Sequence, residues 1–244
     1  MLFNFVQMYK LERESWNEEF EKGKVILVDK PLNWTSFDVV KKIRGLTKTS
    51  KVGHAGTLDP LATGLLIVCT GKFTKRINEF MAAEKEYTGS ITLGYTTASY
   101  DLETEPVFQS SLEHIAEDMI HNATQEFVGN IMQVPPIYSA IKKDGKASYL
   151  SARKGIDIKM EPRPIVIKEF SITSIELPKV YFKVVCSTGT YIRSLAFDFG
   201  NSLGCGAHLS SLIRTRIGEC WLADASSLDE FSKEVNLIKE NYAK

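Results

Sequence analysis

A single acidic residue stands in a loop that is otherwise basic and rich in glycine. Asp59 lies in the stretch Gly53-His-Ala-Gly-Thr-Leu-Asp-Pro60, and the segment from Lys41 to Arg76 holds eight basic residues and no other acid. Because Pro60 disfavours the α region for the residue before it, Asp59 is expected in an extended conformation. An isolated carboxylate of this kind is suited to act as a nucleophile or general base. Asp is also a common cap of a following helix or turn, and the loop by itself favours that interpretation.

Three further segments supply groups that would make such a carboxylate reactive. Arg193, at the end of Gly189-Thr-Tyr-Ile-Arg193, is expected near a helix start, where its guanidinium would hold a carboxylate ionised and oriented. Tyr87 is expected in a strand, and its ring and hydroxyl are suited to stacking or proton transfer. Residues 204–212 are expected to form a tight turn and a short helix that closes a pocket. Each segment also has an ordinary explanation as a surface ion pair, a core tyrosine or a connection.

Taken together and in order, these segments resemble the motifs of the TruB-type tRNA pseudouridine synthases, a family that modifies uridine 55 in the T loop. The matching motifs are Asp29-Lys-Pro, Thr35-Ser36, Gly53-His-Ala-Gly-Thr-Leu-Asp-Pro-Leu-Ala-Thr-Gly64, Lys85-x-Tyr87, Pro135-Pro-Ile-Tyr-Ser-Ala140, Gly189-Thr-Tyr-Ile-Arg193 and Gly204-Cys-Gly-Ala-His208. The resemblance spans about residues 24–222. It implies the pseudouridine synthase fold and an isomerase that uses neither a cofactor nor a metal.

The resemblance also implies roles for individual residues. Asp59 matches the family's catalytic aspartate, which is the nucleophile, and Arg193 matches the arginine that pairs with it. Tyr87 matches the active-site tyrosine that stacks on the target base and is a candidate for proton transfer. The residues expected to contact the everted nucleotide, or to lie near it, are His54, Tyr191, Leu212, Lys30 and Lys75. Attack at C1′, attack at C6 and a glycal route all stay open for Asp59.

The elements that would position these residues mix strands and helices without regular alternation. Strands are expected at residues 24–28, 65–69, 87–95, 165–177 and 180–187, and helices at 10–22, from the cap Thr35-Ser36 to 46, and at 72–83, 112–127, 148–154 and 190–202. A hairpin is expected around Asp144-Gly145. This order favours an α+β fold with a mixed, mostly antiparallel central sheet flanked by helices.

One catalytic domain accounts for most of the expected organisation. It is expected at residues 24–230, with an N-terminal helical extension at 1–23 and a C-terminal tail at 231–244. Residues 134–164 form a basic hairpin-helix insert, which the resemblance identifies as the segment that closes on the RNA stem-loop. Many bacterial members of the family carry an RNA-binding PUA domain near the C-terminus, and residues 222–244 are too few to form one.

The composition excludes several classes of protein. With 244 residues, 43% hydrophobic and 25% charged, the chain is not collagen-like, disordered or a disulfide scaffold. No apolar run approaches the roughly 20 residues that span a bilayer, and the first residues lack a basic leader and a cleavage site. The four cysteines are scattered, which indicates reduced thiols. These features favour a cytoplasmic protein that does not contact a membrane, and nothing indicates an obligate protein partner.

Charges are segregated along the chain although the net charge is zero. Residues 142–168 hold eight basic and three acidic residues, whereas residues 77–126 hold ten acids and only one lysine. Such clustering builds the positive face that a tRNA stem-loop needs, while exposed helix faces explain it about as well.

Three other functions have weaker support. A zinc site starting from Cys205 and His208 lacks further ligands. A glycoside hydrolase needs a second carboxylate near the first, and the motif around Asp59 holds no other acid. A non-catalytic RNA-binding or RNA-folding protein on the same scaffold predicts loss of Asp59, Tyr87 or Arg193, and all three are present.

Overall fold

The computed structural model describes residues 16–139, 142–143, 146–147 and 160–243. The strands of its main sheet are β1 (Val25–Lys30), β2 (Val52–His54), β3 (Ala62–Thr70), β4 (Lys85–Leu93), β7 (Gly129–Gln133), β10 (Arg163–Glu176), β11 (Lys179–Cys186), β12 (Ala207–Ile217) and β13 (Cys220–Trp221). Within the described residues, these nine strands pair in the order β1-β3-β12-β4-β11-β10-β7, with β13 beside β12 and β2 beside β3. Their pairings are antiparallel except that of β12 with β3, which confirms the predicted mixed, mostly antiparallel sheet.

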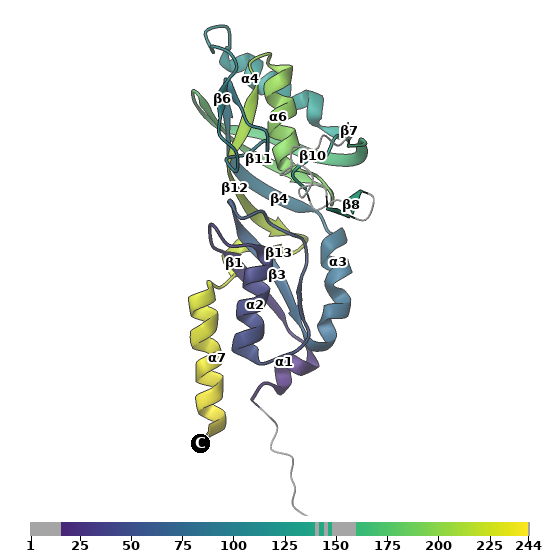
Figure 1. Cartoon of the computed structure of the whole chain (residues 1–244), viewed down its shortest axis with the longest axis vertical. Coiled ribbons are helices and arrows are strands. Elements are labelled where there is room, and N and C mark those ends of the chain that lie inside the picture. Colours follow the sequence, from purple (N-terminus) through teal and green to yellow (C-terminus); the bar gives the residue numbers. More distant parts are fainter. Residues whose placement is uncertain (1–15, 140–141, 144–145, 148–159, 244) are drawn as a thin grey trace, which may run out of the picture.

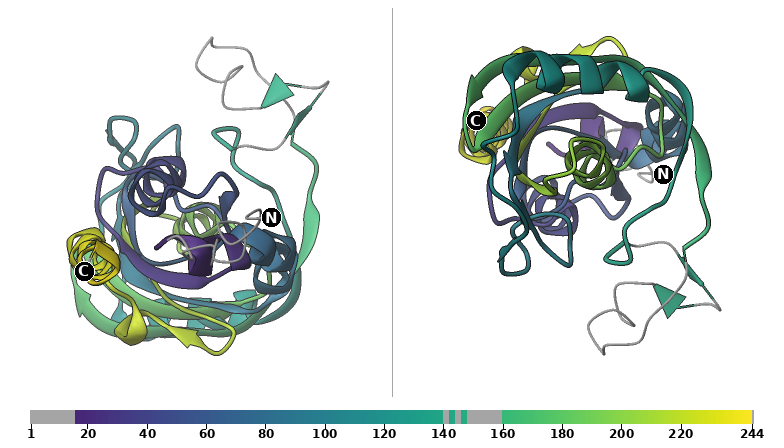
Figure 2. Two further views of the ribbon diagram at one scale, coloured as in Figure 1. Left: turned by 90° about the horizontal axis from the view of Figure 1, so that it is seen from below. Right: turned by 90° about the horizontal axis from the view of Figure 1, so that it is seen from above.

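Helices flank this sheet in two groups. They are α1 (Glu18–Lys22), α2 (Ser36–Thr47), α3 (Ile77–Ala82), α4 (Glu117–Ala123), α6 (Ile192–Ser202) and α7 (Leu228–Ala243). Figure 1 shows α1, α2, α3 and α7 around the lower half of the molecule and α4 and α6 in the upper half. Seen along the long axis, the strongly curved sheet wraps around α6 (Figure 2).

Two short hairpins lie outside the main sheet. β5 (Tyr95–Thr96) pairs with β6 (Val107–Phe108), and β8 (Lys142–Lys143) pairs with β9 (Lys146–Ala147). The pairing of β8 with β9 agrees with the predicted hairpin, whose turn at Asp144-Gly145 lies outside the described residues. The helix expected at residues 148–154 lies outside the described residues.

Each half has its own apolar core. In the upper half, the ring of Phe170 packs edge-on against Phe182 and Phe199, at centroid distances of 6.1 and 5.3 Å, and so joins α6 to the strands. In the lower half, Phe20 of α1 packs against Phe231 of α7 at 6.3 Å, within a cluster that includes α2. Because Phe20 is only 1% exposed, α1 is an integral part of this core. The range expected as a C-terminal tail lies largely within α7.

Local sequence signals explain the helix starts. The Thr35 side chain caps α2, as the sequence predicts, and also forms a capping box with Asp38. The helix expected at 72–83 is divided into a 3₁₀ turn, Gly71–Arg76, followed by α3.

The expectation of a short helix within residues 204–212 is wrong. Gly204 and Gly206 have positive φ values of 74° and 71° and turn the chain from α6 back into the sheet. The residues from Ala207 onward form β12, which is hydrogen-bonded to β4 on one side and to β3 on the other. Short apolar runs do not distinguish a helix from a buried strand, and tertiary pairing decides here.

Candidate active site

A cavity of about 430 Å³ is lined by the β2–β3 loop, β4, the start of α6 and β12. Its wall brings together residues that are far apart in the sequence. Five of the eight predicted site residues line it: Asp59, Tyr87, Tyr191, Arg193 and Leu212.

The loop that carries Asp59 is fixed by the segment around the start of α2. The Ser36 hydroxyl accepts a hydrogen bond from the amide of Leu58 at 2.8 Å and donates one to the carbonyl of Leu58 at 3.1 Å. On the other side of Asp59, the amide of Asn33 donates to the carbonyl of Pro60 at 2.9 Å. The backbone on both sides of the carboxylate is therefore tied down, which restricts where the side chain can point.

Lys30 binds the backbone of the same loop and of the segment before α2. Its side chain is fully buried, and its ammonium group donates to the carbonyls of Pro31 at 2.9 Å, Trp34 at 2.6 Å and Pro60 at 3.4 Å. Burial lowers the pKa of Lys30 to about 8, although the nearby Asp59 carboxylate opposes the change. These contacts suit a residue that positions the loop and leave little of Lys30 to contact a nucleotide.

Arg193 forms an ion pair with Asp59 and is held by three other groups. Its Nε lies 3.0 Å from the Asp59 carboxylate and 3.6 Å from that of Asp101. The two terminal nitrogens donate to the carbonyls of Ser99 at 3.3 Å and Tyr138 at 3.0 Å. The guanidinium is thus enclosed, and Arg193 is only 5% exposed. The second carboxylate was not among the predicted site residues.

The Asp59 side chain faces the cavity and remains 43% exposed. Although the side chain is open to the cavity, the surrounding protein desolvates its carboxyl group and so raises its pKa, and the negative charges of Asp101 and Glu103 act in the same direction. The positive charges of Arg193 and Lys30 oppose that rise. A carboxylate under such opposing influences is typical of a catalytic position.

Tyr87 and Arg214 form a second pair deeper in the site. They are directly opposite each other on β4 and β12, and the positive charge of Arg214 acts on the Tyr87 hydroxyl. Arg214 is 1% exposed and also donates to the carbonyls of Leu65 at 2.8 Å and Gly56 at 3.1 Å. Burial raises the pKa of Tyr87 and keeps its hydroxyl protonated. Arg214 was missed, although its place two residues after Leu212 in a strand indicates the same face.

Of the remaining predicted residues, Tyr191 lines the cavity, whereas His54 and Lys75 do not. The backbone of Tyr191 is held by Gln133, whose side chain accepts from its amide at 2.8 Å and donates to its carbonyl at 3.0 Å. His54 is half-buried in β2, where burial and the charge of Arg214 lower its pKa, and it does not line the cavity. Lys75 is exposed in the 3₁₀ turn and is also outside the cavity wall.

Neither a metal cluster nor a membrane-spanning helix is found in the part of the chain that the structure describes. Within those residues, no three His, Cys, Asp or Glu side chains gather to hold a metal ion. The Cys205 thiol donates to the carbonyl of Gly200 at 3.8 Å, and the ring of His208 lies 3.1 Å from the carbonyl of Tyr95. No helix of the described ranges is long and apolar enough to cross a bilayer.

Comparisons with known proteins agree over nearly the whole chain. The N-terminal domain of TruB family pseudouridylate synthases matches residues 44–192, and the C-terminal domain of tRNA pseudouridylate synthase B matches residues 193–244. The chain is 52% identical to tRNA pseudouridine synthase B of Flavobacterium johnsoniae, covering 89% of this chain and 98% of that protein. It is 50% identical to the protein of the same name from Phocaeicola vulgatus, with coverages of 87% and 93%.

Solved structures support the same relationship. A chain in the crystal structure of a Cbf5-Nop10-Gar1 complex superposes with a TM-score of 0.72 at 30% identity. The match covers 94% of this chain but only 59% of that chain. With the family domains, the relatives and the shared fold in agreement, this chain belongs to the TruB family of pseudouridylate synthases.

Proposed function

We propose that this protein converts uridine 55 in the T loop of tRNA to pseudouridine, in the cytoplasm and without a cofactor. The name of its relatives, tRNA pseudouridine synthase B, supports tRNA as the substrate. The motif resemblance supports the T stem-loop and position 55. One observation carries the proposal: the carboxylate of Asp59 lies 3.0 Å from Arg193 on the wall of a cavity of about 430 Å³. That volume is in the range of small-molecule and cofactor sites.

The reaction is an isomerisation within one nucleotide. The N1–C1′ glycosidic bond breaks, the uracil turns, and C5 bonds to C1′ while the C5 proton is released and N1 gains a proton. Asp59 is the proposed nucleophile, at C1′ or at C6, or it assists a glycal route. Arg193 keeps the carboxylate ionised and aimed, because a charge-assisted pair favours the charged form. A base bound over this pair would keep water away from the intermediate.

The target base must leave its stack before Asp59 can reach it. Flipping a nucleotide costs a few kcal/mol, and stacking on a side chain recovers roughly 1–3 kcal/mol per base. We assign that contact to the ring of Tyr87, with Leu212 and Tyr191 completing the walls. The protonated Tyr87 hydroxyl is a candidate for proton transfer at the base. The insert at residues 134–164 is assigned to the phosphates of the stem-loop, although much of it lies outside the described residues.

Asp59→Asn tests the central assignment. The variant keeps the shape of the side chain and loses the nucleophile, so we expect it to bind tRNA like the wild type and to release no tritium from uridine labelled at C5. Asp229→Asn, on the exposed start of α7, is the matched control and should keep full activity. Undiminished tritium release from Asp59→Asn would remove the nucleophile assignment.

A substrate variant tests the position. Wild-type protein should release tritium from labelled tRNA and should release none when residue 55 of the tRNA is cytidine. Release from the cytidine variant would contradict position 55. Binding of tRNA by the wild type without any tritium release would instead support the non-catalytic RNA-binding or RNA-folding function.

A further inference from the structure

Tyr100 has a backbone conformation that a bulky residue rarely adopts. Its φ angle is 64°, in the left-handed region, and it lies in the turn between Thr97 and Asp101 that follows β5. Such strained residues persist only where their surroundings fix them, and they concentrate at functional sites. The contacts of this turn therefore identify what the strain supports.

Hydrogen bonds within the turn hold its two ends together. The Tyr100 amide donates to the carbonyl of Thr97 at 3.2 Å, and the Thr97 hydroxyl donates to the carbonyl of Asp101 at 2.7 Å. The hydroxyl of Ser99 lies 2.9 Å from that of Thr104. These bonds fix the internal shape of the turn. The Tyr100 carbonyl also accepts a hydrogen bond from the amide of Leu209 at 2.9 Å, which ties the turn to β12 but not to α6.

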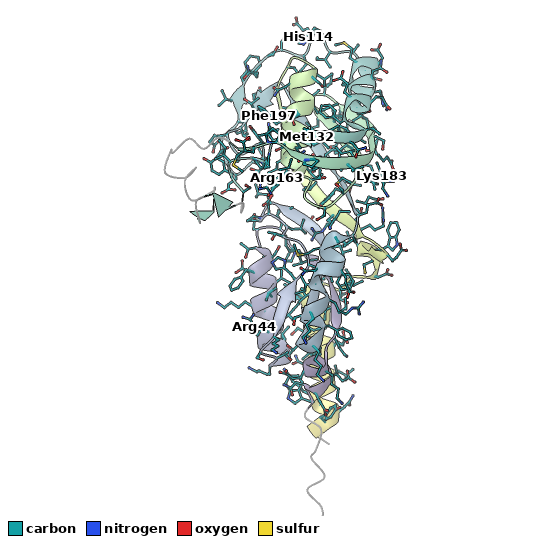
Figure 3. All side chains as sticks on the ribbon, turned by 90° about the vertical axis from the view of Figure 1, so that its right-hand side faces the viewer. Arg44, His114, Met132, Arg163, Lys183 and Phe197 are labelled. Carbon is teal, nitrogen blue, oxygen red and sulfur yellow. The ribbon has the colours of Figure 1, made fainter. Side chains whose placement is uncertain are left out.

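The side chain of Tyr100 supplies a tie to α6. Its ring stacks on the ring of Phe197 with centroids 4.0 Å apart and an angle of 17° between the planes. Phe197 lies four residues after Arg193 in α6, so the two side chains lie on the same face of the helix, one turn apart. Figure 3 shows Phe197 in the upper half of the molecule.

The same turn and the same helix are joined a second time at Arg193. The guanidinium donates to the carbonyl of Ser99 at 3.3 Å and lies 3.6 Å from the carboxylate of Asp101 and 3.0 Å from that of Asp59. A shift of the turn along α6 would therefore move two of the groups that orient the guanidinium.

We propose that Tyr100 and Phe197 are positioning residues for the reaction. Their stacked rings hold the turn at 97–101 against α6, and the turn in its place fixes Arg193 relative to Asp59. This inference rests on the proposed catalytic role of the Asp59–Arg193 pair. The stacked rings position the turn, and the Tyr100 hydroxyl, which lies near the charge of Asp198, is not required for this.

Substitutions at Tyr100 separate the ring from the backbone and the hydroxyl. Tyr100→Phe keeps the ring and should retain kcat within about twofold of the wild type. Tyr100→Asn tolerates the left-handed conformation but removes the ring, so kcat should fall about tenfold through misplacement of the pair, with KM within about twofold. Phe197→Ala should do the same, and the double variant should be no slower than either single one, because both remove one shared contact.

Phe108→Ala is the matched control. Phe108 also packs against a tyrosine, Tyr95, with centroids 5.6 Å apart, but this exposed pair belongs to the β5–β6 hairpin and does not line the cavity. Its kcat and KM should equal those of the wild type. Thermal melts of all the ring variants show whether a fall in kcat only follows a general loss of stability.

Three results would overturn the positioning role: full kcat in Tyr100→Asn, a change confined to KM, or failure of Tyr100→Phe to restore turnover. Asp59→Asn, measured in the same tritium-release assay, separates this inference from the proposed function. If Asp59→Asn is inactive and Tyr100→Asn is fully active, the positioning role alone is wrong. If Asp59→Asn is active, the nucleophile assignment is wrong whatever the ring variants do.

Discussion

Two arginines on the cavity wall bind chemically different partners. Arg193, at the start of α6, lies between the carboxylates of Asp59 and Asp101. Arg214, in the middle of the sheet, is held by two backbone carbonyls, those of Leu65 and Gly56. Both guanidinium groups are almost fully buried, so the difference lies in the partners and not in the exposure.

The difference indicates that the two arginines have different roles. Carbonyl groups do not titrate, so the contacts of Arg214 keep the same strength at every pH and serve to join the β2–β3 loop to the sheet. Carboxylates do titrate, and one of those at Arg193 faces the cavity. Arg193 should therefore control the reactivity of Asp59, and Arg214 should chiefly control the stability of the frame that presents Tyr87.

The largest expected effect is the loss of turnover in Arg193→Lys. Lysine keeps the positive charge, but it cannot contact two carboxylates and two carbonyls with a planar group. We expect kcat to fall about 100-fold or more, because a small displacement of the reacting carboxylate is enough for such a loss. The free energy of unfolding in urea should fall by only about 1 kcal/mol, because the charge stays paired with two carboxylates although the carbonyls of Ser99 and Tyr138 lose a donor. Wild-type turnover in this variant would show that Arg193 is not needed for the reaction.

Arg214→Lys should show the opposite pattern. Lysine cannot reach both carbonyls, and a buried polar group left without a partner costs about 1–3 kcal/mol. We expect the free energy of unfolding to fall by about 2–3 kcal/mol, with a loss of kcat of only about tenfold. Arg216→Lys, on the same strand, is the control and should cost less than about 1 kcal/mol, because its ion pair with Glu84 is partly exposed. If Arg214→Lys were as stable as the wild type, the stabilising role assigned to Arg214 would be wrong.

The sequence was sufficient to find the first arginine but not the second. Arg193 belongs to a motif with a turn and a helix start, signals that are local in the chain. Arg214 lies in β12, whose residues were expected in part as a helix. The pairing that makes β12 a central strand joins residues more than a hundred positions apart, and no short window of sequence contains it. The class of fold was predictable from the order of elements, whereas this central strand was not.

Burial was the second property that the sequence did not provide. Lys30 was expected near the nucleotide, but its ammonium group is enclosed by carbonyls beneath the loop. The cap at the start of α2 was predictable, because Thr35-Ser36 is a local signal. The second task of Ser36, which bonds both backbone groups of Leu58, requires the loop to return to the helix and depends on tertiary structure.

The smallest expected effect, and the one that tests the electrostatic part of the comparison, is that of Asp101→Asn. The amide keeps the shape of the side chain and removes one negative charge beside Arg193. The charge of Asp101 contributes to the raised pKa of Asp59, so its removal lowers that pKa. Since the reaction needs ionised Asp59, the acid limb of the pH profile of kcat/KM should move to lower pH. The rate at neutral pH should fall by about tenfold or less, because Arg193 loses one of its anchors.

Asp198→Asn is the control that makes this shift interpretable. Burial raises the pKa of Asp198 to about 6, so this carboxyl of α6 would itself titrate in the region of the acid limb. Its charge is not among the main causes of the raised pKa of Asp59, so the acid limb should stay in place in this variant. If the limb follows Asp198 instead, or moves to higher pH in Asp101→Asn, then Arg193 does not couple the two carboxylates. The two arginines would in that case differ only in their location, and both would act by stabilising the structure around the cavity.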